Sequence, residues 1–199
     1  GWMAFFCLQM LNIALELAKE NPVYEDIASK FFEHFNLISD SMSFEYLIDN
    51  TGEKCQKIIK QNLWNEKDQF YYDAISWGGP NREQLPVRSL VGLIPLYAAM
   101  TLEPKLLNQF PSFKKRVDWF IDNRPEIVDR NIASMTKRGV GERMLLALVN
   151  EERLKAILSR MLDETEFLSP YGIRSLSKYH EDHPFEMNVH GEQYTVKYL

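Results

Sequence analysis

The sequence predicts a mainly α-helical domain, with helices in successive pairs arranged as a closed toroid. Apolar residues recur at helical spacing over residues 2–19, 23–41 and 150–167. Tandem helical pairs suit either a solenoid or a toroid. The connections between these segments are long and dissimilar, whereas solenoid repeats have short and similar ones. This difference favours the toroid, with short β-hairpins and long loops between the helices.

Residues 2–19 predict a buried helix of a soluble protein. Gln9, Asn12 and Glu16 recur along one of its sides, and the segment has no basic start and no small-residue cleavage site. These features exclude a signal peptide and a membrane anchor. The chain begins in mid-pattern, without a starting Met or a capping residue before Trp2. We therefore expect residues 1–199 to be a single domain that is an incomplete excerpt of a longer protein.

The segments that follow alternate between helix and hairpin. Residues 23–41 place apolar side chains on one face and predict a second helix. Residues 51–62 are polar with a thin apolar stripe, which is consistent with a short helix. Residues 63–75, "LWNEKDQFYYDAI", alternate around a turn and predict a hairpin dense in aromatic side chains.

The middle of the chain is more apolar. Residues 87–101 predict a helix that is buried on all sides and kinked at Pro95. Residues 104–122 predict another helix, whose main segment begins at Pro111. A short hairpin is expected around a turn at residues 138–141, followed by apolar sequence.

The C-terminal part predicts one more helix and a strand. Residues 150–167 form an amphipathic pattern that begins at Asn150, a favoured N-cap residue. Residues 193–199 are strand-like.

Composition limits the class of partner. The 199 residues are 45% hydrophobic and 26% charged, with a formal net charge of −5, which is typical of a soluble globular protein. Without a basic surface, nucleic acid is not expected as a partner, and neither is a membrane. Cys7 and Cys55 are too few for a disulfide framework, and Cys7 lies in an apolar run that favours a buried thiol. A reducing, cytoplasmic location is expected.

The stretch 168–185, "LSPYGIRSLSKYHEDHPF", has no apolar period and carries turn residues such as Gly172. Long loops in compact domains are usually functional or disordered, and disordered segments have few aromatic residues. This loop is rich in aromatic and charged side chains, so we interpret it as the lining of a site. We expect it to lie at the same end of the helices as the 70–73 hairpin, and to face the same concavity.

Two further segments carry candidate binding residues. Asp73 follows the aromatic run at 70–72, and sugar sites combine aromatic faces with carboxylates. The alternative is a hairpin whose aromatic side chains fill the core. Arg88 and Ser89 stand at the entrance of an apolar segment, where the guanidinium could clamp a hydroxylated or acidic ligand. A structural ion pair is the alternative for Arg88.

The "HEDH" run at 180–183 places two histidines three residues apart with acids between them. No third ligand follows at a recognised spacing, so neither a metal nor another cofactor is expected. The sequence also lacks a nucleophile elbow, a phosphate-binding glycine loop and a Cys–His pair.

Several of these segments together resemble a known family. "GWMAFFCLQMLNIALELA", "FYYD", "LPVRSLVGLIPLYA" and especially "YGIRSLSKYHEDHPF" resemble the C-terminal catalytic domain of glycoside hydrolase family 63. This family contains processing α-glucosidases and mannosylglycerate hydrolase-like enzymes. The resemblance covers most of the chain and is weakest at about residues 40–62.

The resemblance implies part of an (α/α)6 toroid, with a sugar pocket formed by loops at one end. It implies hydrolysis of α-glucosides or α-mannosides with inversion, by one carboxylic acid and one carboxylate. Both catalytic groups are expected outside residues 1–199, so no catalytic residue is assigned here. An oligosaccharide or small glycoside is the expected substrate. The candidate substrate-binding residues are Trp2, Tyr72, Asp73, Arg88, Arg174, Ser175, Tyr179, His180 and His183.

Two other functions remain open. One is a non-catalytic helical scaffold or interaction domain derived from such an enzyme. The other is a lyase or epimerase in which Tyr179 and His180 transfer protons. A piece of a toroid would expose an apolar face, so the isolated chain is expected to form a homodimer or to aggregate.

Overall fold

The computed structural model describes residues 1–43, 45–48, 54–59, 63–77, 82–124, 127 and 139–199. Contacts divide the chain into two compact units. The helical unit consists of Gly1–Ser43 and Ile94–Glu151. The hairpin unit consists of Phe44–Leu93 and Glu152–Leu199.

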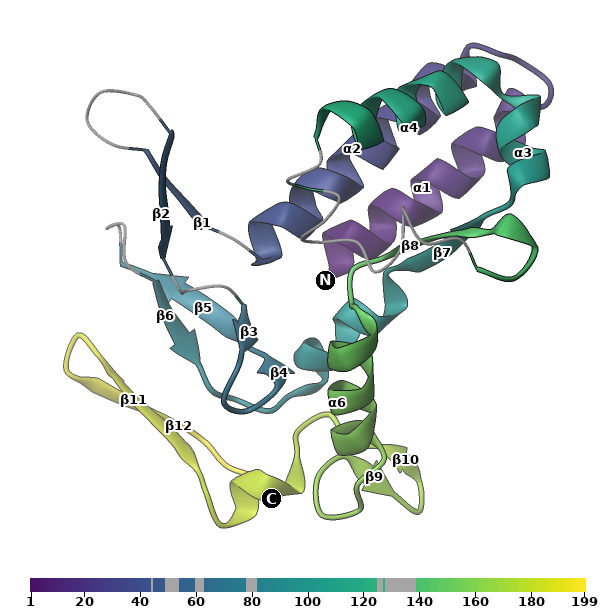
Figure 1. Cartoon of the computed structure of the whole chain (residues 1–199). Helices are drawn as coiled ribbons and strands as arrows, with labels where there is room; N and C mark the ends of the chain where they lie inside the picture. The colour runs from purple at the N-terminus through teal and green to yellow at the C-terminus, as the bar shows by residue number, and fades with distance from the viewer. Residues whose placement is uncertain (44, 49–53, 60–62, 78–81, 125–126, 128–138) are drawn as a thin grey trace. The chain divides into compact units, whose positions relative to one another are not determined.

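Two long helices, α1 (Trp2–Ala18) and α2 (Tyr24–Ser43), lie side by side in the helical unit (Figure 1). Both were predicted from their apolar spacing, and both predictions are confirmed. The buried face of α1 includes Cys7, whose burial raises the pKa of the thiol. The thiol is therefore held in its protonated, less nucleophilic form.

Helices α3 (Pro104–Gln109) and α4 (Pro111–Asn123) confirm the prediction for residues 104–122. Each has a proline in its first turn, where the missing N–H is not needed. The buried Phe32 ring of α2 packs edge-to-face on Phe113 and Phe120 of α4, which joins these two helices.

The apolar segment around Pro95 differs from its prediction. Residues Leu90–Tyr97 form a 3-10 helix, η1, and the chain then continues as strand β7 (Ala99–Leu102). Strand β7 pairs with β8 (Met144–Ala147) in antiparallel register. The prediction of a fully buried α-helix over residues 87–101 is therefore wrong. Proline lacks an N–H and disfavours the α conformation before it, and Leu90, Val91 and Tyr97 are exposed.

The predicted hairpin at residues 138–141 lies partly outside the described residues. Val140–Glu142 form a short 3-10 turn, η2, closed by a hydrogen bond from the Gly139 N–H to the Arg143 carbonyl. The apolar strand that follows is β8, and its described partner is β7.

The hairpin unit contains five strand pairs among the described residues, together with helix α6 (Glu151–Met161) and a 3-10 helix, η3 (Lys178–Glu181). The pairs are β1 (Glu45–Ile48) with β2 (Lys54–Ile59), β3 (Trp64–Asn65) with β4 (Phe70–Tyr71), β5 (Asp73–Ser76) with β6 (Arg82–Leu85), β9 (Leu168–Ser169) with β10 (Gly172–Ile173), and β11 (Phe185–Val189) with β12 (Glu192–Val196).

Three sequence predictions are tested in this unit. The hairpin predicted within residues 63–75 is confirmed, with Trp64 opposite Tyr71. The strand-like C-terminal run is confirmed by β12. The short helix considered for residues 51–62 is wrong, because β2 satisfies its backbone hydrogen bonds by pairing with β1.

An aromatic core holds the hairpin unit together. Phe70 and Phe167 are both completely buried, and their rings stack with centroids 5.7 Å apart. Gly92 lies against this core: a Cβ at this position would approach the Tyr71 carbonyl oxygen to 2.5 Å and the Phe70 ring more closely still. A glycine is required where η1 passes the hairpin.

The predicted fold class, mainly α and part of an (α/α)6 toroid, is wrong. The long helical pairing is confined to the helical unit, while the hairpin unit combines one α-helix, α6, with five two-stranded antiparallel pairs among the described residues. Helices that pair successively around a ring are the defining feature of a toroid, and the described residues of the hairpin unit contain a single α-helix. No helix in the described ranges is both long enough and apolar enough to cross a membrane.

Candidate functional site

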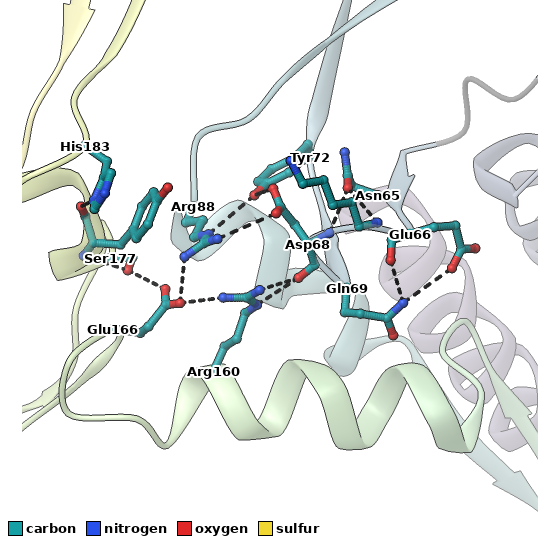
Figure 2. Close-up of polar contacts among 12 residues, drawn as sticks. Asn65, Glu66, Asp68, Gln69, Tyr72, Arg88, Arg160, Glu166, Ser177 and His183 are labelled. Atoms are coloured by element: carbon teal, nitrogen blue, oxygen red, sulfur yellow. Dashed lines mark hydrogen bonds and ion pairs between the residues drawn. The ribbon is translucent and has the colours of Figure 1, made fainter.

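The site in the hairpin unit begins at the tight turn between β3 and β4. The Asn65 side-chain oxygen accepts hydrogen bonds from the backbone N–H groups of Lys67 and Asp68, at 3.1 and 2.9 Å. This Asn-centred turn fixes the position of the Asp68 carboxylate. The Tyr72 hydroxyl then donates to Asp68 Oδ2 at 2.8 Å (Figure 2).

The backbone of Arg88 is held in place by two hydrogen bonds. Its N–H donates to His180 Nε2 at 2.9 Å, and its carbonyl accepts from the Ser177 N–H at 2.8 Å. The next residue, Ser89, forms an antiparallel bridge with Leu176. Residues 88–89 are thus paired to the loop that the sequence singled out, although the two segments are far apart along the chain.

The Arg88 guanidinium is buried, with only 8% of the residue exposed. It donates to Glu166 Oε1 at 2.8 Å and to the Tyr72 hydroxyl at 3.5 Å, and it lies 3.7 Å from Asp68 Oδ1. Of the two interpretations of Arg88, the structure favours the structural ion pair.

Glu166 is the centre of this cluster, as Figure 2 shows. Its carboxylate, also 8% exposed, accepts from Arg88, from Arg160 of α6, and from the Ser177 hydroxyl at 2.6 Å. Arg160 Nε also donates to the backbone carbonyl of Asp68 at 3.0 Å. We call Asp68, Tyr72, Arg88, Arg160, Glu166 and Ser177 the Arg88 network; its two guanidinium groups face two carboxylates.

Burial changes the chemistry of Tyr72. It raises the pKa of Tyr72 to about 12, although the hydrogen bond from Arg88 acts in the opposite direction. The phenol is therefore neutral over the ordinary pH range and serves as a hydrogen-bond donor to Asp68.

The short helix η3 carries two of the predicted site residues, Tyr179 and His180, and a third, His183, follows its end. The Tyr179 ring packs parallel to the His183 imidazole, with centroids 4.2 Å apart, and the Arg88 guanidinium carbon lies 3.8 Å from the same tyrosine centroid. The His183 Nδ1 lies 3.2 Å from the Tyr179 carbonyl oxygen. Tyr179 is partly exposed, so this arrangement leaves an aromatic edge at the surface.

His180 has a structural role. Its Nε2 accepts from the Arg88 N–H, so its Nδ1 carries the hydrogen that is donated to the His183 carbonyl at 2.8 Å. Both ring nitrogens are used within the fold, which leaves the proposed proton transfer by His180 without support. Within the described ranges, no three His, Cys, Asp or Glu residues are arranged to hold a metal ion.

A hollow of about 590 Å³ opens beside η3. It is lined by Glu164, Thr165, Glu166, Lys178, Tyr179, Glu181, Asp182 and His183. We call this the acidic hollow. Glu166 is committed to the Arg88 network, whereas the side chains of Glu164, Glu181 and Asp182 are exposed to solvent.

Arg174 and Ser175 contribute to the shape of the loop. The Arg174 guanidinium donates to the backbone carbonyls of Glu164 at 3.0 Å, Glu166 at 3.3 Å and Leu168. It therefore holds the turn that carries one side of the acidic hollow. Ser175 is exposed, and its carbonyl accepts from the Leu90 N–H at 2.8 Å.

The two remaining predicted residues are not among those that line the acidic hollow. Asp73 is exposed at the start of β5, opposite Leu85, and does not line the hollow. Trp2 belongs to the helical unit, where its ring lies 6.4 Å from that of Tyr97. Arg88 joins the 70–73 hairpin to the 168–185 loop, because its guanidinium contacts the Tyr72 hydroxyl and the Tyr179 ring. No residue of 70–73 is among those that line the acidic hollow, so the expectation that both segments face one concavity is not confirmed.

Sequence reasoning missed Asp68, Arg160 and Glu166. Each is a charged residue in a polar segment that matches no motif. Asp68 and Arg160, which contact each other in the structure, are 92 positions apart in the sequence. Their only sequence signal is that each lies close to a strongly apolar or aromatic run. That signal does not identify a partner.

The chain is similar to one part of a longer protein. It is 80% identical over all 199 residues to the protein named "Uncharacterized protein YMR196W" of Saccharomyces cerevisiae. The chain spans 18% of that protein's length. No family model and no solved structure matches the chain.

Proposed function

We propose that this chain supplies a sugar-binding surface to a glycoside hydrolase, and that the acidic hollow is that surface. The observation that carries the proposal is the combination of exposed carboxylates with the stacked rings of Tyr179 and His183 around one cavity. Carbohydrate sites use carboxylate oxygens to accept sugar hydroxyls and aromatic groups to contact sugar C–H groups. A hollow of about 590 Å³ also falls within the range of small-molecule pockets.

The side chains divide into a supporting set and a binding set. The Arg88 network fixes Glu166 and, through the contact of Arg88 with its ring, Tyr179. Glu181 is the last residue of the same short helix, Asp182 is its C-cap, and both remain exposed. Sugar hydroxyls can therefore reach these carboxylates without breaking the buried pairs.

The resemblance of "YGIRSLSKYHEDHPF" to glycoside hydrolase family 63 supports the same class, because this segment forms one wall of the hollow. The substrates proposed are α-glucosides or α-mannosides, hydrolysed with inversion by two carboxyl groups. The catalytic acid and base are proposed to lie in the parts of the longer protein beyond these 199 residues. This chain then binds and positions the sugar.

A second candidate function is a non-catalytic scaffold. It is favoured by the Arg88 network, in which every charged member is paired with another member and serves the fold. The two functions differ in what they require of the exposed acids of the acidic hollow: a sugar site uses them to bind hydroxyls, and a scaffold does not need them.

The test is hydrolysis of a panel of aryl α-glucosides, aryl α-mannosides and mannosylglycerate. The full-length protein that contains this chain is expected to turn over at least one of them. The 199-residue chain is expected to show no turnover, because general acid and base groups each contribute about 10²–10⁴-fold to such reactions. Failure of the folded full-length protein to hydrolyse any of the panel would favour the scaffold.

A further inference from the structure

Helix α1 carries a second apolar stripe opposite the face that packs on α2. The buried face includes Leu8, Leu11 and Leu15. The second stripe consists of exposed side chains, 43–63% accessible: Trp2, Met3, Phe6, Ile13 and Leu17. At 3.6 residues per turn these five positions span roughly 100° of the helix surface, the width of a core-facing stripe.

The polar residues of α1 are confined to one narrow edge. Gln9, Asn12 and Glu16 fall between the two apolar stripes, and Glu16 is the one charged side chain in Trp2–Ala18. A surface helix normally has one apolar stripe and a broad polar face. The pattern of α1 is instead typical of a helix that is packed on two sides.

The second stripe continues beyond α1. The Trp2 ring lies 6.4 Å from the ring of Tyr97, which is 49% exposed. The exposed apolar surface therefore includes side chains from two elements of the helical unit. Contiguous apolar patches of a few hundred Å² are uncommon on monomeric proteins and mark interaction sites.

The length of the yeast relative indicates the occupant. This chain corresponds to 18% of that protein, so most of such a polypeptide lies outside residues 1–199. A covalently attached segment acts at an effective concentration in the millimolar range for short linkers, which favours it over a second molecule. We propose that the second stripe of α1 is the docking surface for another segment of the same longer polypeptide, one that presents an apolar helical face.

The first test is hydroxyl-radical footprinting of the folded full-length protein, read by mass spectrometry. Oxidation of Trp2, Met3 and Phe6 is expected to be severalfold slower than in the same protein denatured, and independent of protein concentration. Rates equal to those of the denatured protein would overturn the proposal. Protection that disappears on dilution would assign the stripe to a second copy, which also contradicts it.

A pair of variants in the full-length protein gives an independent test. Ile13→Glu places a charge in the second stripe, whereas Asn12→Glu places the same charge on the polar edge one residue away. Ile13→Glu is expected to lower the unfolding temperature, and Asn12→Glu to leave it nearly unchanged. Equal unfolding temperatures for the two variants would mean that the stripe is solvated, and would overturn the proposal.

Discussion

Tyr72 is the residue of the Arg88 network whose titration depends most clearly on the fold. Burial holds its pKa at about 12, while an exposed tyrosine titrates near about 10. The folded state therefore binds the phenolic proton more tightly than the unfolded state. This contribution to stability is complete below about pH 10 and is lost as the pH rises through about 12.

The variant Tyr72→Phe is expected to flatten the fall in unfolding free energy between about pH 10 and pH 12. It also removes the hydrogen bond to Asp68, so its stability at neutral pH is expected to fall slightly. Denaturant unfolding at a series of pH values measures both effects. The control is Tyr171→Phe, at a fully exposed ring, which should leave the curve unchanged. If the unfolding free energies of Tyr72→Phe and the wild type fall equally between about pH 10 and pH 12, the raised pKa is not that of Tyr72.

Glu166 is the residue on which the Arg88 network depends most. Replacing it with alanine leaves Arg88 and Arg160 without their shared carboxylate. Removing one partner of a buried ion pair costs about 3–5 kcal/mol, because the remaining charge is no longer compensated. Glu166→Ala is therefore expected to lower the unfolding free energy by about this amount.

The matched control for that substitution is Glu164→Ala, two residues away. The Glu164 side chain is exposed, and its contact with Arg174 is made by the backbone carbonyl, which alanine retains. A change within about 0.5 kcal/mol is expected for this variant. Chemical denaturation measures the unfolding free energy of both variants. A similar loss of unfolding free energy in both would mean that the Arg88 network does not stabilise the hairpin unit.

At the scale of elements, η1 passes close to the aromatic hairpin at Gly92. Gly92→Ala would place a methyl group against the Phe70 ring and 2.5 Å from the Tyr71 carbonyl oxygen. Overpacking of a filled core costs about 1–3 kcal/mol, and that loss of unfolding free energy is expected here. Gly139→Ala is the control, since its nearest neighbour would be the Arg143 carbonyl oxygen at 3.6 Å. Equal stability of the two variants would show that η1 can move away from the hairpin.

The helices with clear amphipathic spacing were predictable from sequence, and the apolar segment around Pro95 was not. α1, α2 and α6 each have regular apolar spacing, and each forms within its predicted range, although α6 ends at Met161 and not at residue 167. The run at residues 87–101 is dense in apolar residues, so its spacing does not distinguish an α-helix from a 3-10 helix followed by a strand. Pairing with β8, more than forty positions away, decides the outcome there.

In the site, too, contacts between residues far apart in the sequence could not be predicted. Tyr179 and His183, whose rings stack and line the acidic hollow, were identified because they lie close together in one loop of the sequence. Asp68 and Glu166 were missed because their importance comes from contacts with Arg88 that exist only in the folded unit. Composition indicated a sugar-like lining, but could not separate Asp73, which does not line the hollow, from Asp182, which lines it.

At the scale of the whole molecule, each unit has one surface assigned to contacts outside this chain. In the helical unit it is the second stripe of α1, and in the hairpin unit it is the acidic hollow. The first is apolar and suits a protein segment; the second is lined by charged and aromatic side chains and suits a hydroxylated small molecule. The two proposals can therefore fail independently.

Sugar binding by the acidic hollow is the central claim, and calorimetric titration of the full-length protein with its best glycoside tests it most directly. Asp182→Asn is expected to weaken binding about tenfold, since hydrogen bonds to charged groups contribute about 1.5–3 kcal/mol. Glu186→Gln, an exposed acid on β11 that does not line the hollow, should bind like the wild type. Equal affinities for the wild type, Asp182→Asn and Glu186→Gln would contradict the assignment of the hollow as the sugar site.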